Sequence, residues 1–87
     1  MYTIYKGEWT MFKKSKLRKG IKKCKDEITL LESKRSRSQS AIVQAILEQR
    51  DPDEEEVEFF NQYTAKIDEV RNNMYALQRE LDNLEYR

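Results

Sequence analysis

The stretch Asp51-Pro52-Asp53-Glu54-Glu55-Glu56 decides the fold, because it separates two long helical patterns and carries the signals that start a helix. The Asp51 carboxylate can accept the free N–H groups of a first helical turn, and Pro52 fits the first helical position, where no donor is needed. A glutamate three residues after Asp51 completes a capping-box pattern, and the other carboxylates favour the positive end of the helix dipole. A calcium loop would need wider ligand spacing. The stretch therefore predicts a turn at 51–53 and a second helix over 54–87.

A heptad pattern precedes this turn and predicts a first helix over 13–50. From Leu17 onward, apolar residues recur at alternating spacings of four and three, which places them on one stripe of a helix. Arg35 and Ser38 continue this stripe through residues 33–40, a run that has no apolar residue. Two alternatives remain open for this run: a continuous helix with a polar middle, or a break into two helices.

The pattern after the turn is stronger, because none of its seam positions is polar. Its a and d positions hold Phe60, Tyr63, Ile67, Val70, Met74, Leu77, Leu81 and Leu84. Antiparallel packing pairs a with d, which places Ala45 opposite Phe60 and Ile21 opposite Leu84 and leaves Leu17 beyond the end of the second helix. One continuous helix is disfavoured, because proline costs about 3 kcal/mol in a helix interior. We therefore expect an all-α fold, an antiparallel two-helix coiled-coil hairpin that dimerises into a helical bundle.

Composition argues against most catalytic chemistry. The 87 residues include one cysteine, Cys24, together with two glycines and no histidine. Histidine is the commonest general base and a frequent zinc ligand, and a phosphate-cradling loop needs several glycines. Cys24 falls on the apolar stripe, where a thiol packs in the core and is not poised as a nucleophile. We expect no enzymatic activity, no cofactor, no metal site and no small-molecule substrate.

Targeting segments are not evident in the chain. It has no apolar run of about 18 residues and no apolar core of a signal peptide near its first residue, so we expect no membrane span. A single cysteine fits a reducing compartment, and the expected location is cytoplasmic. The small size and the composition rich in Lys, Glu, Asn and Tyr would suit an accessory protein of a phage or mobile element.

Charge is distributed unevenly along the chain. Residues 1–40 hold 12 basic and 4 acidic side chains, whereas residues 41–87 hold 5 and 12. Such asymmetry is typical of a protein with a charged partner or of self-association. The basic run over 13–25 could contact phosphates while the aromatic residues before it stack on bases. Its candidate nucleic-acid contacts are Lys13, Lys14, Lys16, Arg18, Lys19, Lys22, Lys23 and Lys25; the alternative is a solvated basic face that complements an acidic partner.

Apolar side chains that the seam does not use form a second candidate surface. Residues 1–12 are rich in aromatic side chains and are expected to form a short arm that docks on this chain, its subunit partner or a foreign protein. Near the turn the first helix is apolar nearly all round, and such a helix is usually buried on more than one face. The expected dimer or partner-binding patch comprises Val43, Ile46, Leu47, Val57, Phe59, Tyr2, Tyr5, Trp9 and Phe12. Met11 is a possible alternative translation start, which would make the arm dispensable.

These patterns predict a non-enzymatic coiled-coil interaction protein that forms a homodimer and binds another macromolecule, as an adaptor, assembly factor or regulator. The expected partner is another protein. The alternative is a helical hairpin that binds RNA or DNA through residues 13–25. Such binding would be independent of sequence, because the run lacks the Arg, Asn and Gln pattern that reads base edges.

Overall fold

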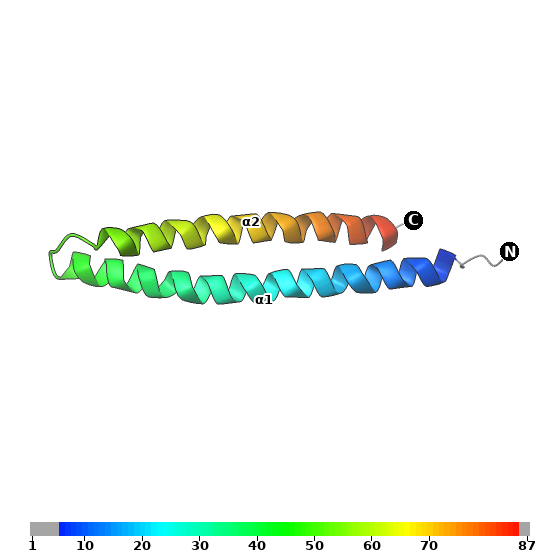
Figure 1. The fold of residues 1–87 in the computed structure, drawn as a ribbon, viewed down its shortest axis with the longest axis horizontal. Coiled ribbons are helices and arrows are strands. Elements are labelled where there is room, and N and C mark those ends of the chain that lie inside the picture. The colour runs from blue at the N-terminus through cyan, green and yellow to red at the C-terminus, as the bar shows by residue number, and fades with distance from the viewer. Residues whose placement is uncertain (1–5, 86–87) are drawn as a thin grey trace.

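Two helices form an antiparallel hairpin in the computed structural model, which describes residues 6–85 and their side chains from residue 9 onward. Helix α1 spans Lys6–Leu47 and helix α2 spans Glu54–Glu85; they lie side by side in a rod with extents of 73 × 17 × 16 Å (Figure 1). The predicted all-α hairpin is confirmed. Helix α1 runs unbroken through residues 33–40, so the continuous-helix alternative is correct. Over the described residues, neither helix combines the length and apolarity that crossing a membrane requires.

The heptad seam forms the core of the rod. Its buried side chains are Leu17, Ile21, Ser38, Ala45, Ile67, Val70 and Leu81, each at a predicted a or d position. Burying an aliphatic side chain of this kind contributes about 1.5–3 kcal/mol. A two-helix rod buries only one such stripe from each helix, and most of the surface of both helices remains exposed.

The helices pair one heptad away from the predicted register. Leu17 is only 7% exposed and packs with Ile21 and Leu81, although the prediction left it beyond the end of the second helix. A Cβ atom added at Gly20 would lie 3.2 Å from the Leu77 Cδ1 atom, in agreement with the shifted register. A shift of one heptad keeps a opposite d, so the seam pattern permits either register. The loop selects the observed one, because it is longer than the predicted turn.

Residues 6–12 are helical, which corrects this part of the predicted arm over residues 1–12. Helix α1 begins at Lys6, so residues 6–12 form its first turns. Adding a residue to an existing helix fixes few dihedral angles and gains a hydrogen bond, and this segment contains no proline to oppose the extension. Tyr2 and Tyr5 lie outside the described residues.

Helix α1 ends at Leu47 instead of residue 50, in a Schellman motif. Gln49 adopts a positive φ of 58°, and its N–H donates to the Ile46 carbonyl oxygen at 3.0 Å. The Arg50 N–H donates to the Ala45 carbonyl oxygen at 2.8 Å. These two bonds satisfy carbonyl groups that the end of the helix would otherwise leave unpaired.

Asp53 occupies the N-cap position of helix α2, whereas the sequence predicts Asp51 at this position. The Val57 N–H donates to the Asp53 carbonyl oxygen at 3.1 Å, which places Pro52 before the cap and outside the helix. Both aspartates are followed three residues later by a glutamate, so local capping chemistry favours either start. The Schellman motif extends to Arg50, so the residues that follow it form the connection to α2. The second helix therefore begins after Asp53 and not after Asp51.

Candidate interaction surfaces

The apolar patch near the turn is exposed on both helices. Val43, Ile46 and Leu47 of α1 are 46%, 59% and 73% exposed. Val57 and Phe59 of α2 are 37% and 36% exposed, and the Phe59 ring stacks on Tyr63 with a centroid distance of 6.2 Å. The adjacent Ala45 is buried in the seam, so α2 covers one side of this part of α1 and leaves the other sides uncovered.

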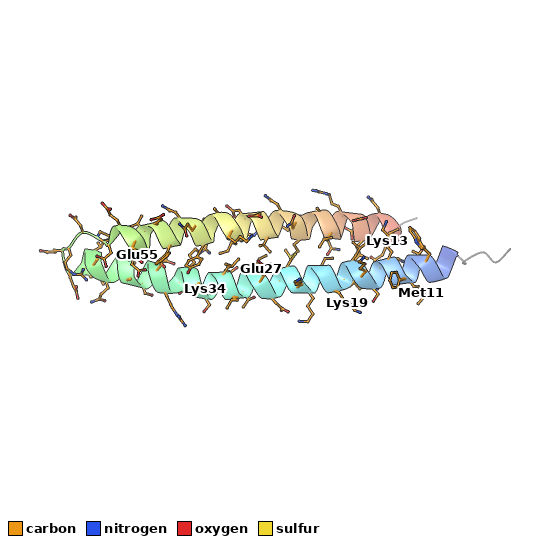
Figure 2. The ribbon with its side chains drawn as sticks, in the orientation of Figure 1. Met11, Lys13, Lys19, Glu27, Lys34 and Glu55 are labelled. Carbon is orange, nitrogen blue, oxygen red and sulfur yellow. The ribbon has the colours of Figure 1, made fainter. Side chains whose placement is uncertain are left out.

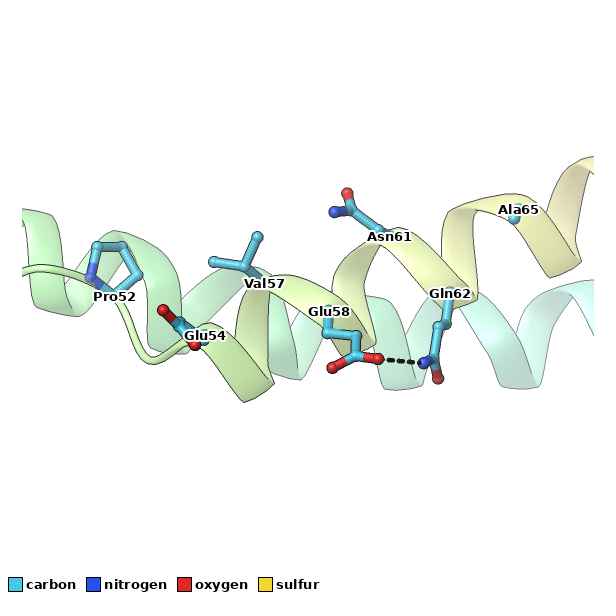
Figure 3. A pocket seen from close by; sticks show the side chains of 7 residues that line it. All are labelled: Pro52, Glu54, Val57, Glu58, Asn61, Gln62 and Ala65. Atoms are coloured by element: carbon cyan, nitrogen blue, oxygen red, sulfur yellow. Dashed lines mark hydrogen bonds between the residues drawn. The ribbon is translucent and has the colours of Figure 1, made fainter.

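A shallow hollow of about 530 Å³ runs along α2 beside this patch (Figure 3). Its lining residues are Pro52, Glu54, Val57, Glu58, Asn61, Gln62 and Ala65. Pro52 precedes the helix cap and Val57 occupies the fourth helical position, which is the pairing of a hydrophobic staple. The Gln62 amide donates to a Glu58 carboxylate oxygen at 3.2 Å. The hollow thus combines an apolar floor with carboxylates, and sequence reasoning missed it because the cap was assigned two residues too early.

A second hollow of about 350 Å³ lies on α1 before the patch. Its lining residues are Ser36, Gln39, Ser40, Val43 and Gln44. The two serines have short side chains, which allow another helix to approach closely. The polar run that the sequence marked as the weak part of the first helix therefore forms a concave surface on the outside of the rod.

A charged pair, Glu48 and Arg50, orients the loop between the helices. The Gln44 amide donates to Glu48 Oε1 at 2.9 Å, and the Arg50 guanidinium binds Glu48 Oε2 at 2.7 Å. The Gln44 hydrogen bond first, and the Arg50 hydrogen bond second, lower the pKa of the Glu48 carboxyl below its ordinary value of 4.5. These contacts are exposed, so they orient the loop more than they stabilise it.

The basic run is only partly engaged by α2. Lys13 pairs with Glu80 at 3.5 Å, and Arg18 pairs with Glu85 at 2.8 Å. Lys22 pairs with Asp26 within α1. Side chains that make no ion pair within the described part of the chain are Lys14, Lys16, Lys19, Lys23 and Lys25. Lys13 points toward α2 in Figure 2 and Lys19 points away from it, so the run offers cations to solvent as well as to the second helix.

Aromatic and apolar side chains continue this surface onto the end of α1. Trp9 is 53% exposed, and Met11 and Phe12 are each 71% exposed, on a segment that extends past the end of α2 (Figures 1 and 2). The Lys13 ammonium lies 5.1 Å from the centroid of the Trp9 ring, a distance that permits a cation–π interaction. Trp9, Lys16 and Lys23 are one heptad apart and therefore lie on one side of the rod.

Among the described residues, the remaining side chains that could act in catalysis or metal binding do not lie close together. Cys24 is partly buried on the seam and lines, together with Leu77, a third hollow of about 440 Å³. Among the described residues, no group of three His, Cys, Asp or Glu side chains is arranged to hold a metal ion. No protein-family model, curated protein or solved structure matches the chain.

Proposed function

We propose that the hairpin is a non-enzymatic interaction protein that self-associates and binds another macromolecule, as an adaptor, assembly factor or regulator. The observation that carries this proposal is the exposure of Ile46 and Leu47 at 59% and 73%. Large aliphatic side chains on consecutive exposed positions are typical of an interface, and the apolar neighbours from α2 enlarge the patch.

Self-association is favoured by the free energy that this patch can contribute. Ile46 and Leu47 are already partly buried, so burying the rest of these side chains in two copies contributes about 4–8 kcal/mol before the cost of association. A micromolar dimer corresponds to about 8 kcal/mol, and association costs at least about 4 kcal/mol. The patch therefore supplies a large share of the free energy that a dimer needs, and neighbouring contacts must supply the rest.

Sedimentation equilibrium tests the proposal. The native chain is expected to be dimeric at tens of micromolar, and Leu47→Asp is expected to be monomeric with unchanged helicity by circular dichroism. Tyr75→Asp, which alters a side chain of α2 that is 50% exposed, provides the matched control and should remain dimeric. A native chain that is monomeric over this concentration range would refute self-association.

Nucleic-acid binding is a second candidate function, favoured by one arrangement. An exposed Trp9 ring and the cations Lys16 and Lys23 share one side of the rod, so bases could stack on the ring while phosphates contact the ammonium groups. Such contacts release counterions, and the affinity for single-stranded oligonucleotides should fall steeply with salt.

A fluorescence titration with a labelled oligonucleotide at several salt concentrations tests this candidate. Lys16→Gln with Lys23→Gln should weaken binding and flatten its salt dependence. Lys34→Gln, which removes another exposed lysine of α1 outside the basic run, is the control. Affinity that does not change with salt, or that is equal in both variants, would remove this candidate.

A further inference from the structure

We infer that two copies of the chain pair antiparallel along α1, so that the open end of each rod covers the turn end of its partner. This inference rests on the self-association proposed above and specifies the surface and orientation through which it occurs. The two-fold axis would cross α1 near Thr29, perpendicular to the rod. A two-fold interface must be self-complementary, and α1 carries such a pattern.

Both ends of α1 carry apolar side chains that α2 does not cover. Helix α1 has 42 residues and α2 has 32, so the longer helix cannot be covered along its whole length. At the open end, Met11 and Phe12 are each 71% exposed on the segment that extends past α2 (Figure 1). At the turn end, Ile46 and Leu47 are 59% and 73% exposed in the last turn of α1. Each end therefore presents two adjacent apolar side chains to solvent.

These two pairs lie on the same side of the rod. Met11 is five whole heptads before Ile46, and Phe12 is five whole heptads before Leu47. Equal heptad positions keep the same orientation relative to the α1–α2 seam. A two-fold axis midway between the pairs brings Phe12 onto the partner's Leu47 and Met11 onto the partner's Ile46. Four apolar contacts that no single hairpin can make are thereby formed in the dimer.

The surface of α1 between the two apolar ends is also complementary to the same surface of the partner. Lys25 and Glu32 share one heptad position on either side of the axis, and neither makes an ion pair within the described residues. Antiparallel pairing places the ammonium of Lys25 beside the carboxylate of the partner's Glu32, and the symmetric contact follows. The hollow at Ser36 and Ser40 then lies opposite the partner's basic run, whose lysine stems can cover it while their ammonium groups reach water.

The charges of the whole rod favour the antiparallel orientation. The half nearer the open end, residues 9–27 and 71–85, holds 10 basic and 5 acidic side chains, a net charge of +5. The half nearer the turn, residues 28–70, holds 5 basic and 10 acidic side chains, a net charge of −5. Packed helices lie about 8–10 Å apart, close to the screening length of physiological salt. Antiparallel rods place opposite charges at this distance, whereas parallel rods would place like charges there.

Disulfide crosslinking of mixed variants tests the orientation. Phe12→Cys and Leu47→Cys are made in separate chains, each with Cys24→Ser to remove the native thiol, and the two chains are mixed and oxidised. Both altered side chains are exposed, so the fold should be retained. We expect the mixed disulfide between the two variants to predominate. Disulfides between two copies of the same variant would show that like ends meet, which overturns the inference but leaves self-association intact.

A charge reversal provides an independent test. Lys25→Glu and Glu32→Lys should each weaken the dimer roughly tenfold, because two contacts per dimer become repulsive. An equimolar mixture of the two variants should form a heterodimer of nearly native affinity, since each reversed charge then meets its opposite. Variants that dimerise normally alone, or a mixture that does not recover, would contradict the α1 pairing. A monomeric native chain in the same sedimentation experiment would instead refute the proposed function.

Discussion

At the residue scale, the backbone of Gln49 determines how α1 ends. Its φ of 58° lies in the left-handed region, where a side chain costs about 1–2 kcal/mol and glycine is the usual occupant of a Schellman motif. We predict that Gln49→Gly raises the free energy of unfolding by about 1 kcal/mol, measured by urea denaturation at one fixed protein concentration. Gln39→Gly, in the interior of the same helix, should lower it by about 1 kcal/mol. Equal changes at the two positions would contradict this reading of the turn.

Asp51 and Asp53 show what the local sequence can predict about the turn. The acidic stretch was correctly recognised as the start of a helix, because both aspartates in it suit an N-cap. Asp53 and not Asp51 occupies the N-cap position because the preceding Schellman motif extends as far as Arg50. That motif could not be foreseen, since glutamine has no particular preference for positive φ and the glycine that usually marks such an end is missing.

At the scale of the elements, the seam was predictable and its register was not. Every buried side chain of the described chain falls on a predicted a or d position, because the 3.5-residue period identifies the stripe that faces a partner helix. The same period repeats every seven residues, so sliding one helix by a heptad gives another complete seam. Packing of Leu17 against Leu81 resolves this ambiguity in favour of the shifted register.

An intrachain disulfide distinguishes the two registers. Gly20→Cys with Leu77→Cys, in a Cys24→Ser background, should crosslink within one chain, because the Cβ position of residue 20 lies 3.2 Å from Leu77 Cδ1. Gly20→Cys with Leu84→Cys, which the unshifted register would bring closer, should crosslink far more slowly. Non-reducing electrophoresis at low protein concentration separates these outcomes, and a faster reaction of the second pair would restore the unshifted register.

The polar middle of α1 gives a second prediction about the elements. Ser38 is only 4% exposed on the seam. Ser38→Asp should lower the free energy of unfolding by about 1–3 kcal/mol, because a carboxylate at this buried position loses its hydration and Arg35, three residues earlier on the seam, offsets only part of that loss. Asn72→Asp, at an exposed position of α2 outside the proposed α1 interface, should change it by less than about 0.5 kcal/mol. Similar effects in thermal and urea unfolding of the two variants would mean that the seam does not pass through residue 38.

At the scale of the whole molecule, the candidate surfaces were only partly accessible from sequence. Apolar residues near the turn could be identified because the seam does not use them, and the structure leaves Ile46 and Leu47 exposed. The exposure of Met11 depends on how far α1 extends past α2, which follows from the register and the loop length. The two hollows beside the patch likewise depend on which side chains become neighbours outside the seam, and heptad counting does not address that surface.

The two proposed surfaces depend on different side chains, Ile46 and Leu47 for the dimer and Trp9 with two lysines for nucleic acid, so they should be separable by mutation. Ile46→Asp should convert the dimer to a monomer and leave oligonucleotide binding with its steep salt dependence. Lys16→Gln with Lys23→Gln should leave the dimerisation constant within about threefold of native, because exposed charges contribute little individually. The same variant should reduce the salt slope of single-strand binding by about 1.4, the value for two lost phosphate contacts. Sedimentation and fluorescence titration of both variants measure these quantities in parallel. Loss of both activities in Ile46→Asp would mean that oligonucleotide binding requires the dimer, and that the surface around Trp9 does not bind nucleic acid by itself.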